Sequence, residues 1–388
     1  MADRTEVSPL MEGTTLLHVG PPKTGSTTLQ SAFLVGREPL AQAGIRILSE
    51  GARARAAVND LRSGQSGWVE EVERLRASGA AAREWISNED FASVSDDEAD
   101  RLLRGLGPAT TQVVYVVRPL ERLLPSQWQQ RVRRSLRAPA YDDWLRLVLA
   151  DAGGEEHHEH FWARHRLADQ VAKWARRPGR DPSQLTFVIA REGDHSHLLQ
   201  VFGELMGVPD HRLEAAPSRN SSISLSVAEF LRSLDQAVSE GSVDRNRYRE
   251  RLKVHIARAL RDMPKDPRET PILLPAWAVD RVRQLDAERV DFLSGCGATV
   301  IGDPAWLLQV EPRVRAADPT EPERLSVDRV ATLMAWALER GQGASKESRG
   351  GVARRPQPSV RSQQRPTVDE LSTRQLMREV GARLVRRR

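Results

Sequence analysis

The segment 14–30 constrains the fold of this chain more than any other and reads TTLLHVGPPKTGSTTLQ. It begins with an apolar, β-branched run typical of a buried parallel strand. Gly20, Pro21 and Pro22 end the run, because proline cannot continue a central strand ladder. A helix is expected from about Ser26. A lysine, several hydroxyl groups and unpaired backbone N–H groups therefore meet at a helix N-terminus, which is where phosphate binds.

The rest of the chain alternates strand-like and helix-like segments, which predicts an α/β fold: a three-layer, P-loop-like arrangement around a mainly parallel central sheet. The region 51–64 shows little periodicity and is expected to be a surface excursion. Further strands are expected at 45–48, 84–87, 112–117 and 185–189, and helices at 68–75, 198–206, 225–263 and 278–293.

The chain is expected to form one domain followed by a basic tail. Residues 13–224 are interpreted as the α/β core, residues 225–341 as a helical C-terminal part of the same domain, and residues 342–388 as a disordered linker with a possible amphipathic helix at 368–385. The formal net charge is +5, but residues 343–388 hold twelve Lys or Arg against four Asp or Glu, which leaves −3 for residues 1–342. Nucleic-acid binding is therefore not expected, and the tail is interpreted as solvated.

Cysteine content and hydropathy point to the cytoplasm. The single cysteine, Cys296, excludes a disulfide framework and any multi-cysteine metal site. No hydrophobic N-terminal segment and no apolar run of membrane-spanning length is visible, so neither export nor a membrane span is expected. The sequence does not reveal the oligomeric state.

The 14–30 segment departs from the P-loop of nucleoside triphosphatases in two ways. Lys23 precedes Gly25 instead of following the second glycine, and the strand 112–117 ends in Arg118 instead of a magnesium-binding aspartate. These differences argue against a magnesium triphosphate as the ligand. They favour a phosphate-bearing donor that contacts a second cationic side chain as well as Lys23.

Two motifs resemble those of sulfotransferases that use 3′-phosphoadenosine 5′-phosphosulfate. The first is HVGPPKTGSTTLQ together with Gly44-Ile45, and it resembles the family's phosphosulfate-binding loop. The second is VVYVVRPLERLLPSQWQ, a strand ending in arginine with a serine eight positions later. The segments HFWARHRLADQVAKWARRPG and NSSISLSVAEFLRSL are similar to the bacterial branch of this family, so the resemblance covers residues 14–263.

The resemblance implies a role for each residue of the two motifs. Lys23 would stabilise the charge on the leaving phosphate, and Arg118 with Ser126 would hold the donor's 3′-phosphate. The alternative for this pair is a helix-start arginine and a surface serine. Pro125 lies between them, so either the helix kinks or it begins at Pro125. The donor's 5′-phosphate would lie on Pro22, Lys23, Thr24, Gly25, Ser26 and Thr27.

The acceptor hydroxyl needs a general base, and two candidates remain open. Glu89 follows a strand expected to lie beside the first one, so it would emerge near the donor, although it could equally be a solvated loop acid. The rival is a histidine-rich stretch, GGEEHHEHFWARH, expected to be a flexible loop that either covers the acceptor site or is simply solvated. It contains His157, His158, His160 and His165, and it lacks the H-E-x-x-H pattern of a metal site.

The function implied by the resemblance is in-line sulfuryl transfer to a hydroxyl or amine of a carbohydrate, lipid or small metabolite, with no metal required. Two alternatives stay open. One is a nucleotide or small-molecule kinase built on the same loop. The other is a non-catalytic nucleotide-binding module that docks through its basic tail.

Overall fold

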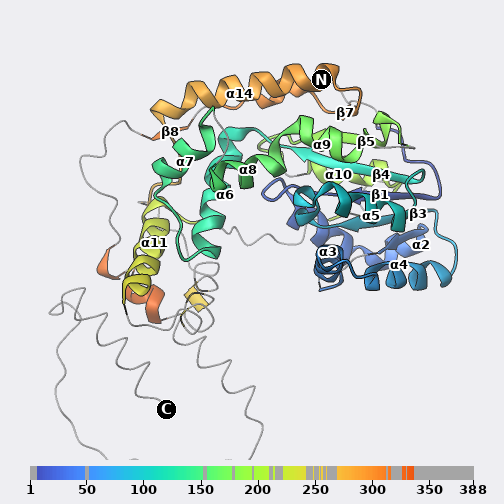
Figure 1. Ribbon diagram of the computed structural model, residues 1–388, viewed down its shortest axis with the longest axis horizontal. Helices are drawn as coiled ribbons and strands as arrows, with labels where there is room; N and C mark the ends of the chain where they lie inside the picture. Colours follow the sequence, from blue (N-terminus) through green and yellow to red (C-terminus); the bar gives the residue numbers. More distant parts are fainter. Residues whose placement is uncertain are drawn as a thin grey trace, which may run out of the picture. The chain divides into compact units, whose positions relative to one another are not determined.

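The centre of the molecule is a six-stranded parallel sheet with the strand order β2-β3-β1-β4-β5-β7. The computed structural model in Figure 1 describes residues 7–48, 52–151, 155–176, 180–194, 196–208, 213–214, 222–241, 248, 253, 255–256, 259, 269–311, 313–315, 326–328 and 330–335. The strands are β1 (Thr14–His18), β2 (Ile45–Ile47), β3 (Arg83–Ser87), β4 (Thr111–Val117), β5 (Leu185–Ile189) and β7 (Thr299–Ile301).

Helices cover both faces of this sheet, so the protein has the three layers expected of its α/β class. The hydrophobic core of one face joins the sheet to α1 (Ser26–Val35), α2 (Arg37–Gln42) and α10 (His197–Leu205). The core of the other face includes α3 (Ala52–Ser63), α4 (Gly67–Ala77), α5 (Asp96–Leu106) and α9 (Leu167–Trp174).

Successive residues of the central strands supply these two cores alternately. In β1, Leu16 belongs to the core of the α1 face and Leu17 to the core of the α5 face. In β4, Val116 belongs to the core of the α1 face and Val117 to the core of the α5 face. A strand buried on both faces needs apolar side chains at every position, which is why these strands read as continuous apolar runs in the sequence.

A second group of helices packs together beyond the end of β4, and Figure 1 shows it beside the sheet. Asp286 lies on α14, the longest helix of this group, and is 3% exposed. It accepts a hydrogen bond from Leu120 N at 2.9 Å, so it caps α6, the helix that follows β4. Arg289 pairs with Asp286 at 2.5 Å and donates to Arg118 O at 3.0 Å. The group comprises α6 (Leu120–Arg134), α7 (Tyr141–Leu149), α8 (Glu156–His165), α11 (Leu225–Glu240) and α14 (Ala276–Gly295).

Three expectations from the sequence differ from the structure. The region 51–64 forms α3, in which Val58 and Leu61 reach the core. The histidine-rich stretch forms α8, whose positions 158, 161, 162 and 165 are buried on one face. The C-terminal part is not purely helical, because β7 pairs with β5 and a small parallel pair forms from β6 (Leu274–Pro275) and β8 (Val314–Arg315). The tail 342–388, including 368–385, lies outside the described residues.

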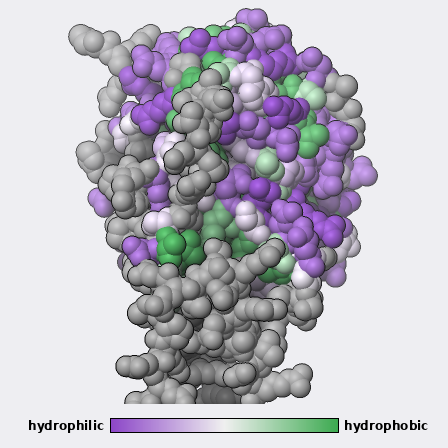
Figure 2. Space-filling model, turned by 90° about the vertical axis from the view of Figure 1, so that its left-hand side faces the viewer, coloured by the Kyte–Doolittle hydropathy of each residue, from purple (hydrophilic) through white to green (hydrophobic). Residues whose placement is uncertain are grey.

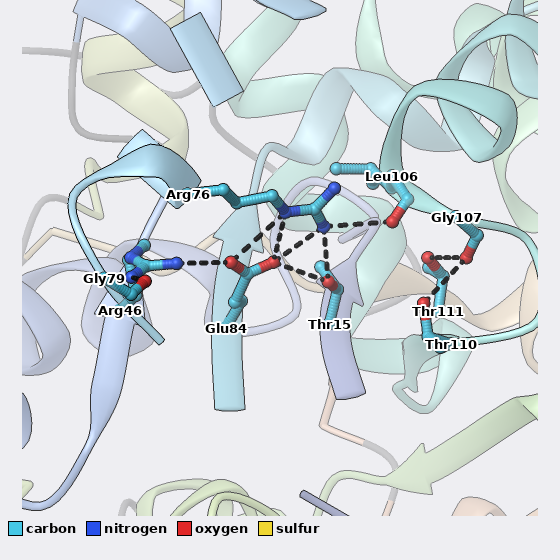
Figure 3. A network of polar contacts seen from close by, with 9 residues as sticks. All are labelled: Thr15, Arg46, Arg76, Gly79, Glu84, Leu106, Gly107, Thr110 and Thr111. Carbon is cyan, nitrogen blue, oxygen red and sulfur yellow. Dashed lines mark hydrogen bonds and ion pairs between the residues drawn. The ribbon is translucent and has the colours of Figure 1, made fainter. Parts of the chain in front are cut away.

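A polar network ties three strands together at the amino end of the sheet (Figure 3). Glu84 on β3 lies between Arg46 on β2 and Thr15 on β1, its direct neighbours in the strand register. Its carboxylate pairs with Arg76 at 2.7 Å and Arg46 at 3.0 Å and accepts a hydrogen bond from Thr15 Oγ1 at 2.9 Å. Arg76 also donates to Leu106 O at 3.0 Å, so the network joins α4 and α5 to the sheet.

Glu84→Gln is expected to lower the free energy of unfolding by roughly 2 to 3 kcal/mol, because it leaves two arginines facing a neutral amide. Burial raises the pKa of Glu84, but hydrogen bonds from Arg76 and Thr15 outweigh it and the net shift is downward from 4.5. The stabilisation is therefore present above pH 4.5 and is lost as the pH falls through the lower folded-state pKa. Urea denaturation across this pH range measures both effects.

Asp143→Asn is the matched control, because its side chain is 68% exposed and it pairs with Arg146 only at the surface. We expect it to change the free energy of unfolding by less than about 0.5 kcal/mol. Equal losses in the two variants would contradict the role given to Glu84.

The described surface is mostly hydrophilic on the face shown in Figure 2, with a few smaller hydrophobic patches between charged groups. Large exposed apolar side chains are scattered, as at Met11, Trp277 and Val327. Within the described residues, every helix is too short or too polar to cross a lipid bilayer.

Candidate functional site

The loop between β1 and α1, residues 20–27, has the backbone geometry of an anion-binding cradle. Gly20 and Gly25 have φ of 90° and 101°, and Lys23 between them has φ of 71°. The Gly20-Pro21 peptide bond is cis. Left-handed residues followed by a helix turn successive N–H groups toward one point, which forms a concave anion site. A non-glycine residue held at positive φ is also typical of functional loops.

The start of α1 leaves its backbone N–H groups available to a ligand. Its N-cap is Gly25, which has no side chain to cap the helix, and its first turn holds no acidic residue. By contrast, Ser95 caps α5 in a full capping box with Glu98. A ten-residue helix with an open, uncapped N-terminus and a lysine two residues before its cap favours an anion.

The hydroxyl groups of the cradle have different surroundings. Thr24 Oγ1 and Ser26 Oγ are buried and donate to Pro21 O, at 2.7 and 3.3 Å. These two hydroxyls hold the loop in shape, whereas Thr27 is exposed at the first turn of α1. The sequence predicts all three as phosphate ligands, and in the structure only the Thr27 hydroxyl lies open at the surface of the loop.

Glu89 lies against the cradle because β3 pairs with β1. The register places Ser87 beside His18, and Ser87 Oγ is 2.8 Å from His18 Nδ1. Two residues later, Glu89 approaches Gly20 so closely that a Cβ atom on Gly20 would be 2.8 Å from Glu89 Cα. Only glycine fits at position 20, and this contact fixes the backbone of Glu89 beside the loop.

The charges of Lys23 and Glu89 influence each other. Burial lowers the pKa of Lys23, as do Arg133, Arg134 and Arg118, while Glu89 raises it. Burial raises the pKa of Glu89, Asp90 adds to this rise, and Arg134 and Lys23 oppose it. Arg134 lies 3.7 Å from Glu89 Oε1. A half-buried carboxylate with a raised pKa beside a lysine with a lowered pKa has the features of an acid-base site.

Arg118, a predicted ligand of the 3′-phosphate, already has two partners. Its Nε and Nη2 atoms lie 2.5 and 3.2 Å from the carboxylate oxygens of Glu192, and its Nη1 donates to Lys23 O at 2.8 Å. Arg118 therefore supports the backbone of the cradle. An anion at Arg118 would have to displace the carboxylate of Glu192.

Ser126 lies in the interior of α6, which runs through Pro125 and begins at Leu120. The sequence-based alternative that the helix begins at Pro125 is wrong, because Asp286 caps the earlier start. Ser126 Oγ donates to Arg122 O at 3.0 Å, a bond within the helix. The structure does not join Ser126 to Arg118 by a hydrogen bond among the described residues, so its role as a donor ligand stays a prediction.

A pocket of about 320 Å³ opens beside the cradle, and we call it the basic pocket. Gln127 connects it to the cradle, because Gln127 Nε2 donates to Pro22 O at 2.9 Å and lies 3.2 Å from His165 Nε2. The basic pocket is lined by Pro22, Asp90, Gln127, Gln130, Arg131, Arg134, Ser135, Trp144, His157, His160, Phe161, Arg164 and His165.

The histidines of α8 are not equivalent as candidate bases. His158 is buried near Trp162 and does not line the basic pocket. His165 is buried with its Nε2 at Gln127, and His160 Nε2 lies 2.5 Å from Arg164 Nη1. His157 lines the basic pocket, and its Nδ1 has no hydrogen-bond partner in the described part of the chain. The histidine alternative stays open for the three that line the basic pocket, His157, His160 and His165.

The sequence analysis missed several residues that the fold brings to this site. Glu192 follows β5, and β5 pairs with β4 so that Ile189 lies beside Val117. The sequence carries one signal for Glu192, because it is a charged residue shortly after a buried strand. Gln127 lies within the second motif but has no predicted role there. Arg131 and Arg134 lie beyond the motif on α6, and Arg164 lies on α8. Their meeting depends on how α6 packs against α8, which no local pattern shows.

Comparison with protein families and with curated proteins identifies no family for this chain. A scan against protein-family models finds no match for this chain, and a search of curated proteins finds none either. The functional interpretation therefore rests on the site itself.

Proposed function

We propose that this protein transfers a sulfuryl group from 3′-phosphoadenosine 5′-phosphosulfate to a hydroxyl or amine of an acceptor. The observation that carries the proposal is an uncapped α1 N-terminus that follows Lys23 in a loop against which Glu89 packs at Gly20. An anion cradle supplies binding of the donor phosphate, and the carboxylate supplies a base for the acceptor. The sequence resemblance in residues 18–30 and 113–129 points to the same reaction.

Each residue has a defined part in the proposed reaction. Glu89 removes the proton of the acceptor hydroxyl while the acceptor oxygen forms a bond to sulfur. The bond between sulfur and the bridging phosphate oxygen breaks, and the electron pair stays on the phosphate. The Lys23 ammonium and the N–H groups at the start of α1 stabilise the charge that develops there. The products are a sulfated acceptor and 3′-phosphoadenosine 5′-phosphate.

A kinase remains the second candidate because of one observation. Magnesium-triphosphate sites use a carboxylate at the end of a strand near the phosphate loop. At the end of the strand 112–117, the sequence has Arg118 in place of such a carboxylate. In the structure, Glu89 and Asp90 follow β3, which is the direct neighbour of β1.

Titration calorimetry with 3′-phosphoadenosine 5′-phosphate, AMP and ATP-magnesium separates the candidates. We expect the bisphosphate to bind at least about tenfold more tightly than AMP, because a 3′-phosphate adds charge-assisted hydrogen bonds. We also expect it to bind more tightly than ATP-magnesium. A preference for ATP-magnesium would support the kinase and contradict the sulfotransferase.

Glu192→Gln is expected to raise the affinity for 3′-phosphoadenosine 5′-phosphate about tenfold, because the anion no longer competes with a carboxylate for Arg118. The affinity for AMP should not change, since AMP lacks the 3′-phosphate that Arg118 is predicted to hold. Calorimetry with both nucleotides measures the difference. Equal effects on both nucleotides, or none on either, would remove Arg118 from the 3′-phosphate site.

A further inference from the structure

The basic pocket concentrates positive charge in a partly enclosed space. Arg131 and Arg134 reach it from α6, and Arg164 reaches it from α8. Arg133 and Lys23 lie near enough to influence the same charges. The carboxylates that act on these groups are fewer than the cations: Asp90 lines the pocket, Glu89 lies at Arg134, and Glu156 acts on Arg131. The described residues thus leave an excess of cations around the pocket.

The guanidinium groups in this space are only partly neutralised, since Arg134 lies 3.7 Å from Glu89 Oε1. Arg131 Nε is buried with no hydrogen-bond partner among the described residues, and the same is true of Arg164 Nε. Arg164 Nη1 meets a histidine nitrogen and not a carboxylate. Buried donors without partners and like charges packed together both cost stability. An anion in the pocket would reduce the repulsion between these guanidinium groups.

The other walls of the pocket suit a small organic molecule and not a bare ion. Trp144 and Phe161 line one part of it, with ring centroids 6.1 Å apart, and Gln127 and Ser135 add neutral polar groups. Pro22 belongs both to this wall and to the cradle, so a molecule in the pocket would lie next to the bound donor. A volume of about 320 Å³ accommodates a molecule of monosaccharide size.

We infer that the basic pocket binds the acceptor, and that this acceptor is a hydroxyl-bearing organic anion whose carboxylate, phosphate or sulfate group pairs with Arg131 and Arg164. The identification of the bound molecule as the sulfuryl acceptor rests on the proposed function. The anion preference of the pocket follows from its own charges. Arginine fits this task because its planar guanidinium binds carboxylate, phosphate and sulfate oxygens in pairs.

The test is calorimetry with matched charged and neutral probes, with the cradle saturated by 3′-phosphoadenosine 5′-phosphate and again without it. The charged probes are glucuronate, glucose 6-phosphate and glucose 6-sulfate, and the neutral ones are glucuronamide and glucose. We expect at least one charged probe to bind about tenfold more tightly than its neutral counterpart. The three charged probes also show which anionic group the pocket prefers.

Arg131→Gln should weaken binding of the preferred charged probe about tenfold without lowering the melting temperature, because the carboxylate that acts on Arg131, Glu156, is exposed to solvent. Arg74→Gln is the control, since Arg74 is an arginine on α4 whose side chain is 70% exposed. It should leave probe binding unchanged. Binding of the bisphosphate should be the same in both variants.

Equal binding of charged and neutral probes, or equal binding by the wild-type protein and Arg131→Gln, overturns the inference. Displacement of the charged probe by the bisphosphate also overturns it, because the pocket would then be part of the donor site. Probe binding that depends on Arg131 in a protein that does not bind the bisphosphate supports the anion pocket and removes the donor assignment. These outcomes distinguish a wrong assignment of the basic pocket from a wrong assignment of the protein's function.

Discussion

Replacing Lys23 with glycine is expected to lower the rate of sulfuryl transfer about 10²- to 10³-fold, because the ammonium that stabilises the leaving phosphate is removed. Glycine is the best replacement here, since Lys23 has φ of 71° and glycine adopts this conformation without strain. The melting temperature should therefore stay the same or rise. Initial rates with the phosphosulfate donor measure the catalytic effect.

Lys23→Met and Lys23→Arg complete this experiment. Methionine removes the charge but keeps the strain, so it should match glycine in rate and fall below it in stability by about 1 kcal/mol. Arginine keeps the charge and should retain more of the rate. Near-normal turnover in Lys23→Gly would show that the ammonium has no part in the reaction.

Glu89→Gln is expected to lower turnover about 10²- to 10⁴-fold while leaving the affinity for 3′-phosphoadenosine 5′-phosphate unchanged, because the amide cannot accept the acceptor's proton. Burial holds the pKa of Glu89 above 4.5, and activity requires the ionised form. In the wild-type protein, the rate should therefore fall as the pH drops through a value above 4.5. This acid limb should disappear from the residual activity of Glu89→Gln.

His157→Asn and Asp90→Asn are the matched comparisons for Glu89. Both residues line the basic pocket. Loss of turnover and of the acid limb in His157→Asn, with near-normal turnover in Glu89→Gln, would assign the base to His157. Asp90→Asn removes the neighbouring carboxylate, and we expect its effect on turnover to be smaller than that of Glu89→Gln.

The sheet could be predicted because its strands carry their own signal. The run Leu185–Ile189 has apolar side chains at most positions, and a strand buried on both faces requires this. The turn after β1 was visible for the same reason, since Gly20, Pro21 and Pro22 end the strand and Ser26 starts the helix. The mainly parallel sheet and the three layers are confirmed.

Other elements could not be predicted because their signals are weak or depend on distant contacts. The helix α3 is rich in arginine and alanine, so its hydrophobic periodicity is weak; among its described side chains, Ala57, Val58 and Leu61 reach the core. In α8, the buried positions 158, 161, 162 and 165 follow helical spacing, but the histidines and glutamates suggested a loop. The cap of α6 comes from Asp286, 166 residues away in the sequence.

The candidate site also has one part that the sequence could suggest and one part that it could not. Lys23 and Glu89 come together because each follows one of two neighbouring strands, which the sequence could suggest. The pairing of Arg118 with Glu192 needs the register of β4 against β5, and the basic pocket needs the packing of α6 and α8. Local sequence patterns contain neither.

The central claim is that the cradle holds a phosphosulfate donor and passes its sulfuryl group to an acceptor. A single competition experiment tests it most directly: the full-length protein is incubated with labelled 3′-phosphoadenosine 5′-phosphosulfate, differently labelled ATP-magnesium and an extract of small anionic metabolites. We predict that the sulfur label alone appears in a new product and that Lys23→Gly lowers the rate of this transfer about 10²- to 10³-fold. Transfer of the phosphate label from ATP, with no transfer of sulfur, would contradict the account.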